Sequence, residues 1–453
     1  MVAPRRSRRA AAVNPAASFA AGLLLVACSS DIDSTATDET VGSSATADEA
    51  PGDGSATTDA EPDDTEPAGT EPADTEPAET EPDHTAATDT AATDTAPDAV
   101  QLDPATLADV QEQTEAVFSG LVKDEPGCTW AVGLNGDVVE AGARGAASID
   151  PFAPMTTDTI VDIGSTSKQF TALAIVLLAQ EGELALDDTL ATYLPDLPAW
   201  AEEVTLRQMV HHTSGIPDYI SLLLDQGFDY SDVTTDADTL DVLAQVTDLD
   251  FPPDDHFEYS NSNYFLLGQV VTAITGEALG DFLASEVFEP LGLDMVMDPT
   301  ADLTAKATSY EWDDDASDWV VADSPWKQTG DGGIQTTPTE LVRWASEWWA
   351  PTVGGPDVNE VRLGDTVEAD DGVGYGYGMG IYEDPTLGTV LTHSGGWAGF
   401  VTSFVVLPAD HLAVSATCTA GELDVMQGEP GIDIATIWHD ALHPEDADAA
   451  SGG

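Results

Sequence analysis

The sequence predicts one large α+β domain, because strand patterns flank a long helical region. Residues 128–148, CTWAVGLNGDVVEAGARGAAS, alternate around an Asn-Gly dipeptide, a strong short-range signal for a β-hairpin. The middle of the chain shows helical apolar spacing, and strand-like runs return after about residue 375. We therefore expect a sheet that unites strands from both ends of the domain and packs against helices.

The expected elements follow in chain order. Apolar periodicity predicts a first helix in TLADVQEQTEAVFSGLVKD, and a second after a Gly-Ser-Thr-Ser-Lys turn in the run FTALAIVLLA. Residues 300–330 are acidic and contain tryptophan, and we expect them to be irregular. The remaining expectations are a proline-broken helical region at 189–219, a loop feeding helices at 257–293, a helix at 337–349, and strands at 375–384 and 388–420.

The charge of the chain is strongly negative. It has 84 Asp and Glu against 12 Lys and Arg, a formal net charge of −72. Residues 101–453 alone hold 63 acidic and 8 basic residues, so the imbalance is not confined to a tail. Such a surface repels nucleic acid, and we expect no DNA or RNA partner.

The first 27 residues predict a secretory signal peptide. Four arginines precede a short apolar run that ends in small residues before Cys28, and this run is too short to span a membrane. LVAC, at residues 25–28, resembles the lipobox of bacterial lipoproteins, in which Cys28 becomes the lipidated N-terminus. The alternative is a plain signal peptide with an incidental cysteine.

Residues 28–100 predict a disordered acidic linker. TEPAGTEPADTEPAETEP repeats a Thr-Glu-Pro unit without large apolar residues, so the segment cannot bury enough surface to fold. The linker is either a stalk that holds the domain away from a membrane or a solubilising tail. The folded domain is expected at 101–443, and the last residues, 444–453, are expected to be disordered.

Ser165 and Lys168 form an S-x-x-K motif at the start of the apolar helix. Positions i and i+3 share one helix face, so the two side chains can meet. Burial against apolar packing and the positive helix N-terminus both favour a neutral lysine, which could act as a base for a serine nucleophile. The alternative is a helix cap, since serine is also favoured at that position.

Two later motifs favour a catalytic role for Ser165 over the helix-cap alternative. Tyr259-Ser260-Asn261 stands immediately before a helix, and His393-Ser394-Gly395-Gly396 stands at a strand end. In this order the three motifs resemble those of the penicillin-recognising serine hydrolases, namely class C β-lactamases, D-Ala-D-Ala peptidases and related esterases. HHTSGIPDY and YGYGMGI are similar to that family too, and the resemblance covers about residues 105–440.

The resemblance implies an antiparallel sheet flanked by helices, plus an all-helical subdomain. It implies that Ser165 is acylated, that Lys168 takes its proton, and that Tyr259 relays protons to the leaving group and to water. Asn261 and His393 would contact the substrate, with His393 in the place usually held by a lysine and also contacting Tyr259. Backbone N–H groups of Ser165 and Gly396 would form the oxyanion hole, and Gly395 would belong to the same substrate-binding strand.

The resemblance also bears on the cysteines. In that family fold the first and last strands are antiparallel neighbours, which implies a disulfide between Cys128 and Cys418. The departure from lysine at His393 weakens the recognition of a substrate carboxylate, because imidazole titrates near neutral pH. Trp397 and Phe400 would give the site an apolar wall.

Other signals are weaker. His211 and His212 lack a cysteine or carboxylate at ligand spacing, so we interpret them as structural and expect no metal and no organic cofactor. GVGYGYGMG lacks the Lys-Ser/Thr of a phosphate loop and predicts a glycine-rich strand.

We therefore expect an exported serine hydrolase that works through an acyl-enzyme on an ester or a D-amino-acid amide, as a D-peptidase, carboxypeptidase-like enzyme or esterase. The substrate would be a small molecule or a peptide, including peptidoglycan fragments. The alternatives are a class C-like β-lactamase and a non-catalytic penicillin-binding-type sensor. We expect a monomer, lipid-anchored to the outer face of the cytoplasmic membrane in the cell envelope.

Overall fold

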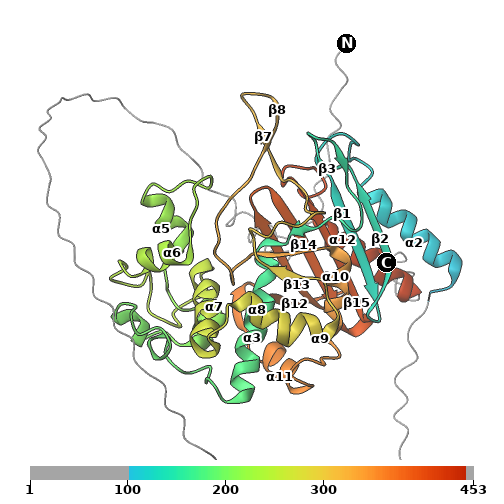
Figure 1. The fold of residues 1–453 in the computed structure, drawn as a ribbon. Coiled ribbons are helices and arrows are strands. Elements are labelled where there is room, and N and C mark those ends of the chain that lie inside the picture. The colour runs from blue at the N-terminus through green and yellow to red at the C-terminus, as the bar shows by residue number, and fades with distance from the viewer. Residues whose placement is uncertain (1–101, 445–453) are drawn as a thin grey trace, which may run out of the picture. The chain divides into compact units, whose positions relative to one another are not determined.

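The structure is a computed structural model that describes residues 102–444, and its centre is an eight-stranded antiparallel sheet. The strand order is β10-β11-β12-β13-β14-β15-β1-β2, so the last strands lie beside the first hairpin (Figure 1). The predicted α+β class, with a sheet that unites both ends of the domain, is confirmed. The strands are β1 (Cys128–Leu134), β2 (Asp137–Arg144), β10 (Val367–Asp370), β11 (Val373–Gly376), β12 (Met379–Asp384), β13 (Gly388–Trp397), β14 (Phe400–Leu407) and β15 (Leu412–Cys418).

The central strands are apolar or small on both faces because helices cover both faces of the sheet. Every residue of β1 and β15 is buried, whereas the edge strands β2 and β10 are partly exposed. The predicted hairpin is present, and its Asn135 and Gly136 both have positive φ, at 55° and 86°. That conformation matches the right-handed twist of the two strands, which explains the Asn-Gly dipeptide.

The two cysteines lie directly opposite each other. β1 pairs antiparallel with β15 in a register that faces Cys128 with Cys418, and the structure joins them in a disulfide with a Cα–Cα distance of 4.0 Å. The bond closes a sequence separation of 290 residues. It therefore ties the start of the domain to its last strand.

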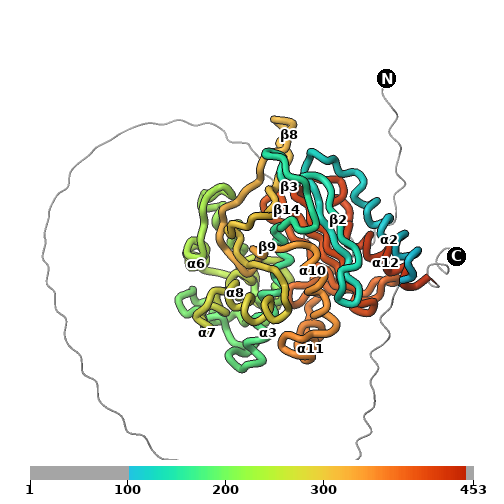
Figure 2. Tube along the Cα trace, turned by 45° about the vertical axis from the view of Figure 1, so that its right-hand side comes forward, coloured from blue at the N-terminus to red at the C-terminus, as the bar shows by residue number. Residues whose placement is uncertain are grey.

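One face of the sheet is covered by α2 (Pro104–Val117) and α12 (Pro430–Leu442), which lie side by side in Figures 1 and 2. Trp438 of α12 donates a hydrogen bond from Nε1 to Thr114 Oγ1 of α2 at 3.0 Å. Phe118, just after α2, stacks on Trp130 of β1 with ring centroids 4.0 Å apart. These contacts belong to the smaller of two apolar cores, which lies between this face of the sheet and the two helices.

The other face packs against α10 (Pro338–Trp344) and against the turn that leads into α3 (Lys168–Glu181). The first eleven residues of α3 are all buried, which is typical of a helix surrounded by other elements. In residues 102–444, no helix combines the length and apolar character that a membrane crossing requires. The other helices are α4 (Leu206–Val210), α5 (Tyr219–Asp225), α6 (Asp236–Leu243), α7 (Asn261–Thr275), α8 (Leu279–Leu283), α9 (Glu289–Leu291) and α11 (Asp357–Gly364).

The prediction of an irregular segment at 300–330 is wrong for its middle. There β7 (Tyr310–Asp313) and β8 (Asp318–Val321) form a hairpin. Trp312 faces Trp319 across the strands with ring centroids 5.2 Å apart, and Asp313 Oδ1 accepts from the backbone N–H groups of the turn. A cross-strand aromatic pair and a capped turn stabilise a hairpin despite the surrounding acidic composition.

The region at 189–219 is less helical than its apolar spacing predicted. Residues 189–219 form only short 3₁₀ turns before α4, as the prolines suggested. Three small sheets complete the fold, with strands β3 (Ala146–Ser148), β4 (Ala153–Pro154), β5 (Val161–Asp162), β6 (Val296–Met297) and β9 (Ile334–Thr336) beside the β7–β8 hairpin. The predicted signal peptide, Cys28, the linker at 28–100 and the tail beyond residue 444 lie outside the described residues.

Candidate active site

Ser165 lies on a 3₁₀ turn, η1 (Gly164–Ser167), that leads into α3. Gly164 has a φ of 51°, and a Cβ there would lie 2.6 Å from the backbone nitrogen of Gly396, so the turn requires glycine. Ser165 is 8 % exposed. It is not the cap of α3, because the cap position is held by Ser167 and carries no side-chain capping bond.

Lys168 is fully buried and donates from Nζ to three oxygens. The acceptors are Ser165 Oγ at 3.1 Å, Asn261 Oδ1 at 2.8 Å and the backbone carbonyl of Asp331 at 2.6 Å. Burial lowers the pKa of Lys168 to about 8, although the carboxylates of Asp331 and Asp218 oppose this shift. A large fraction of Lys168 is therefore neutral near pH 8 and able to accept the proton of Ser165.

Asn261 begins α7 and is held from both sides of its amide. Its Oδ1 accepts from Lys168, and its Nδ2 donates to Asp218 Oδ2 at 2.9 Å. The backbone N–H of Asn261 donates to the same carboxylate oxygen at 2.7 Å. Asp218 therefore orients Asn261, and Asn261 in turn positions Lys168; its contact with a substrate stays a prediction.

Tyr259 lies beside the lysine on the loop before α7. The Lys168 ammonium is 4.9 Å from the Tyr259 ring centroid, and the ring stacks on His212 with centroids 4.3 Å apart. The Tyr259 hydroxyl is buried without a hydrogen-bond partner of normal geometry, yet it lies near enough to Ser165 for that hydroxyl to favour its ionised form. Burial dominates and raises the pKa of Tyr259 well above its usual value, so Tyr259 keeps its proton at neutral pH.

His393 is also buried, on β13, and both of its ring nitrogens have partners. Nδ1 donates to the backbone carbonyl of Ser394, and Nε2 accepts from the hydroxyl of Tyr375 at 3.2 Å. Burial lowers the pKa of His393 to about 3, and nearby Lys168 adds to the effect. His393 is therefore neutral. Its ring centroid lies 6.4 Å from that of Tyr259, and the side chain that its Nε2 contacts among the described residues is Tyr375.

The glycines of the third motif allow β13 to touch the nucleophile turn. A Cβ at Gly395 would overlap the carbonyl oxygen of Ile163, and the backbone nitrogen of Gly396 lies next to Gly164. The structure thus brings Gly396 close to the residue preceding Ser165. The oxyanion hole formed by the N–H groups of Ser165 and Gly396 stays a prediction that this proximity supports.

Sequence reasoning missed Asp331, a buried carboxylate beside the lysine. Tyr219 donates its hydroxyl proton to Asp331 Oδ2 at 3.0 Å, and Asp331 Oδ1 is buried without a partner. Burial raises the pKa of Asp331 to about 6, opposed by the positive charge of Lys168. The available signal was a lone acidic residue inside the glycine-rich stretch TGDGG.

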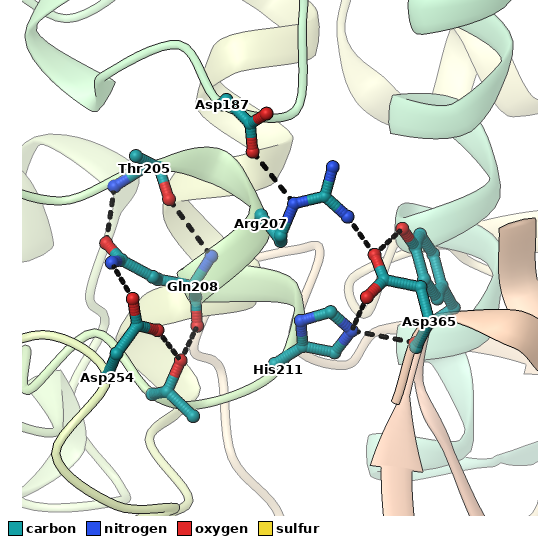
Figure 3. A network of polar contacts seen from close by, with 9 residues as sticks. Asp187, Thr205, Arg207, Gln208, His211, Asp254 and Asp365 are labelled. Atoms are coloured by element: carbon teal, nitrogen blue, oxygen red, sulfur yellow. Dashed lines mark hydrogen bonds and ion pairs between the residues drawn. The ribbon is translucent and has the colours of Figure 1, made fainter. Parts of the chain in front are cut away.

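The predicted structural histidines do hold loops in place. His212 accepts at Nδ1 from the backbone of Ser260 at 3.2 Å, next to Tyr259. His211 contacts the backbone carbonyl of Asp365, and Arg207 bridges Asp365 and Asp187 in the network of Figure 3. This network fixes the loop after α4 against the segment that leads into β10.

The glycine-rich run was predicted as one strand, but it forms two antiparallel strands, β11 and β12, joined by a turn. A Cβ at Gly378 would overlap the backbone nitrogen of Gln169, so this turn presses on the first residues of α3. The run has no helix after it and serves packing rather than phosphate binding.

An aromatic group lies beside the third motif. The Trp397 ring is partly exposed and lies 5.9 Å from Tyr230 and 5.6 Å from Trp326, measured between centroids. Tyr230 follows α5, and Trp326 follows β8. Phe400, which we predicted to share this wall, is the cross-strand partner of Trp397 and is buried in the larger core on which Trp397 packs.

The structure brings Ser165, Lys168 and Tyr259 together, as the resemblance to serine hydrolases implied. The family model described as "Beta-lactamase" matches residues 114–431, and the chain belongs to this family. Penicillin-binding protein 4* of Bacillus subtilis (strain 168) is 27 % identical over 292 residues, which is 60 % of this chain and 63 % of that protein. A D-aminopeptidase of Brucella anthropi is 31 % identical over 274 residues, which is 60 % of this chain and 51 % of that protein. The chain thus spans about half to just under two thirds of these relatives.

Solved structures of other proteins share the fold of this chain. The octameric penicillin-binding protein homologue from Pyrococcus abyssi superposes with a TM-score of 0.63 at 25 % identity, covering 76 % of this chain and 78 % of that one. The D-amino acid amidase from Ochrobactrum anthropi SV3, complexed with D-phenylalanine, superposes with a TM-score of 0.60 at 21 % identity, covering 76 % of this chain and 99 % of that one.

Proposed function

We propose that this protein hydrolyses the amide or ester of a D-amino acid through an acyl-enzyme on Ser165. The observation that carries the proposal is the 3.1 Å contact between Ser165 Oγ and a buried Lys168 whose pKa is lowered to about 8. A lysine with that pKa accepts a proton near neutral pH, which an exposed lysine does poorly.

The reaction follows from these positions. Neutral Lys168 takes the Ser165 proton as Oγ bonds to the substrate carbonyl carbon. The resulting oxyanion is stabilised by backbone N–H groups of Ser165 and Gly396. Tyr259, which keeps its proton, donates it to the departing nitrogen or oxygen, and Lys168 returns a proton to Tyr259. Water then attacks the ester carbonyl, passes a proton to the same pair, and releases the acid and Ser165.

The charges around Ser165 favour a substrate with a free amine over one with a free carboxylate. His393 is neutral, and Lys168 is uncharged in the form that accepts the Ser165 proton, so neither is a fixed positive charge for a substrate carboxylate. Asp218 and Asp331 place two acidic groups near the lysine. This supports an aminopeptidase or amidase-like specificity above that of a carboxypeptidase, and the similarity to D-aminopeptidases points the same way.

β-Lactam hydrolysis is the second candidate, because the family includes it. A non-catalytic sensor is disfavoured: burying a lysine beside a serine costs free energy, and a binding protein has no need of that arrangement.

The test uses two covalent probes and matched substrates. We expect a fluorophosphonate to label the protein but not Ser165→Ala. We expect a D-amino-acid nitroanilide with a free amine to turn over at least about tenfold faster than its N-acetylated form, since a single charge contact is worth that much. If there is no Ser165-dependent adduct and no turnover of nitrophenyl esters, the results would favour a non-catalytic sensor. If a labelled penicillin forms a covalent adduct that is quickly hydrolysed, the results would favour β-lactamase activity.

We also propose that the chain is exported, lipidated on Cys28 and present as a monomer at the outer face of the cytoplasmic membrane. The support is the charged, apolar and small-residue order of the first 28 residues. Intact-mass analysis of the membrane fraction should find a diacylated N-terminal cysteine that Cys28→Ala lacks, and light scattering of the detergent-free domain should give one chain. An unlipidated N-terminus would contradict the anchor.

A further inference from the structure

A second polar cluster lies at the other end of the sheet from Ser165. It consists of Asp410, at the end of the 3₁₀ turn η6 (Pro408–Asp410) between β14 and β15, and of His439 and His443 on α12 and its C-cap. From the sequence we expected no metal, and these residues were not singled out. The two histidines nevertheless stand at i and i+4, the spacing that places two imidazoles on one helix face.

The three side chains converge on one point. Asp410 Oδ2 lies 2.6 Å from His439 Nδ1, and Asp410 Oδ1 lies 2.8 Å from His443 Nε2. One ligand atom from each residue lies within 4.8 Å of the other two. The Asp410 and His439 side chains are 7 % and 10 % exposed, whereas His443 is 40 % exposed. The cluster is thus a built site with one side open to solvent.

We propose that Asp410, His439 and His443 bind one zinc ion or a similar divalent transition metal. Two imidazoles and a carboxylate are nitrogen and oxygen ligands that suit zinc, and three protein ligands leave a fourth position for water. Calcium or magnesium is disfavoured, because both prefer all-oxygen sites.

Metal binding needs only small changes at the cluster. In the metal-free state each imidazole donates its proton to one Asp410 oxygen. With zinc bound, each ring carries its proton on its other nitrogen, and the metal takes the place of the two bridging protons. The two N···O separations then widen to about 3.3 Å, the spacing of tetrahedral ligands at bond lengths of about 2.0–2.1 Å. The exposed edge of His443 provides the route of entry.

The position of the cluster indicates a structural role. The β13–β14 turn lies at the Ser165 end of β14, and η6 follows the opposite end. The eight residues of β14 separate the two by about 23 Å. A metal there would clamp α12 to the β14–β15 turn and would not reach the reacting atoms.

The chain offers a matched control in His256. Its Nδ1 faces Asp255 at 3.0 Å and its Nε2 faces Glu258 at 3.6 Å. These carboxylates contact opposite edges of the ring, so they cannot share one metal with it. His256→Ala removes an exposed imidazole between carboxylates without touching the proposed site.

The experiment titrates the full chain, without an affinity tag, with Zn²⁺ and separately with Co²⁺. Excess Mg²⁺ is present throughout to compete for non-specific binding to the surface carboxylates. We expect one Zn²⁺ per chain by calorimetry, and an intense Co²⁺ absorption in the visible region, typical of tetrahedral coordination. His439→Ala and His443→Ala should each weaken binding by at least about 10–100-fold, the loss that even an outer-shell partner causes. His256→Ala should bind like the wild type.

Two further readouts separate this site from the catalytic one. Zn²⁺ should raise the melting temperature of the wild type but not of His443→Ala, whose half-exposed side chain can be removed without a large cavity. Nitrophenyl ester turnover should be equal with and without the metal. No stoichiometric binding in the wild type, or equal affinity in the wild type and both histidine variants, would overturn the proposal.

Discussion

The buried polar groups at the two ends of β14 differ in whether they have hydrogen-bond partners. At the Ser165 end, the Tyr259 hydroxyl and Asp331 Oδ1 are buried without a hydrogen-bond partner of normal geometry among residues 102–444. At the η6 end, both oxygens of the buried Asp410 carboxylate are engaged by His439 and His443. An unpaired buried polar group costs about 1–3 kcal/mol, and these two lie beside the Ser165–Lys168 pair, where a bound substrate can supply the missing partner. The comparison teaches that the first end is arranged for chemistry and the second for holding α12.

The largest effect that tests this comparison is expected at Lys168. Lys168→Ala removes the base that contacts Ser165 Oγ, and turnover of a nitrophenyl ester should fall by about 100-fold or more. Lys123→Ala, which removes an exposed lysine over Phe152, serves as control and should retain full activity. A near-normal rate in Lys168→Ala would remove the lysine from the mechanism.

Tyr259→Phe should follow, with a loss of about 100-fold in kcat for amide substrates. The ring packing on His212 is preserved, and only the buried hydroxyl that donates to the leaving group is lost. The loss should be smaller for nitrophenyl esters, whose leaving group departs without a proton. Equal losses for both substrate types would argue against a proton-donor role.

At the other end, Asp410→Asn should change stability and leave turnover intact. The amide can satisfy only one histidine as an acceptor, so the free energy of unfolding should fall by about 1–3 kcal/mol. Denaturant unfolding measures the fall, and ester turnover at 25 °C measures activity. A loss of activity in the folded variant would contradict the separation of the two ends.

The smallest expected effect is a shift in pH dependence. The Asp331 carboxylate raises the pKa of Lys168, so Asp331→Asn should lower it and move the rising limb of kcat/KM to lower pH by about one unit. Glu112→Gln, on α2 across the sheet, should leave the limb in place. A shift to higher pH would mean that the carboxylate acts in some other way.

Much of this could be predicted from the sequence because the signals are local. The Asn-Gly hairpin, the helix after Lys168 and the three motifs each depend on a few neighbouring residues. The sheet order and the facing cysteines followed only from the resemblance, because strand partners 290 residues apart leave no local trace.

What was missed depends on distant contacts. The lowered pKa of His393 arises from burial and from the charge of Lys168, and Asp331 matters because folding places its backbone carbonyl and its carboxylate beside Lys168. Phe400 was assigned to the site because it is near His393 in the sequence, but it is buried in the larger core, on which its cross-strand partner Trp397 packs. The pair His439 and His443 had helical spacing, yet its partner Asp410 lies on another element.

The central claim is that a neutral Lys168 activates Ser165, and the most direct test is the pH dependence of Ser165 acylation. Single-turnover labelling by a fluorophosphonate isolates the same base-assisted attack, because Ser165 Oγ bonds to phosphorus as fluoride leaves and the adduct is not hydrolysed. Since the base must be deprotonated, the rate should rise about tenfold per pH unit below the pKa of Lys168, and level off above about pH 8. A rate independent of pH between 6 and 9, or one still rising steeply at pH 10, where an ordinary lysine titrates, would contradict the account.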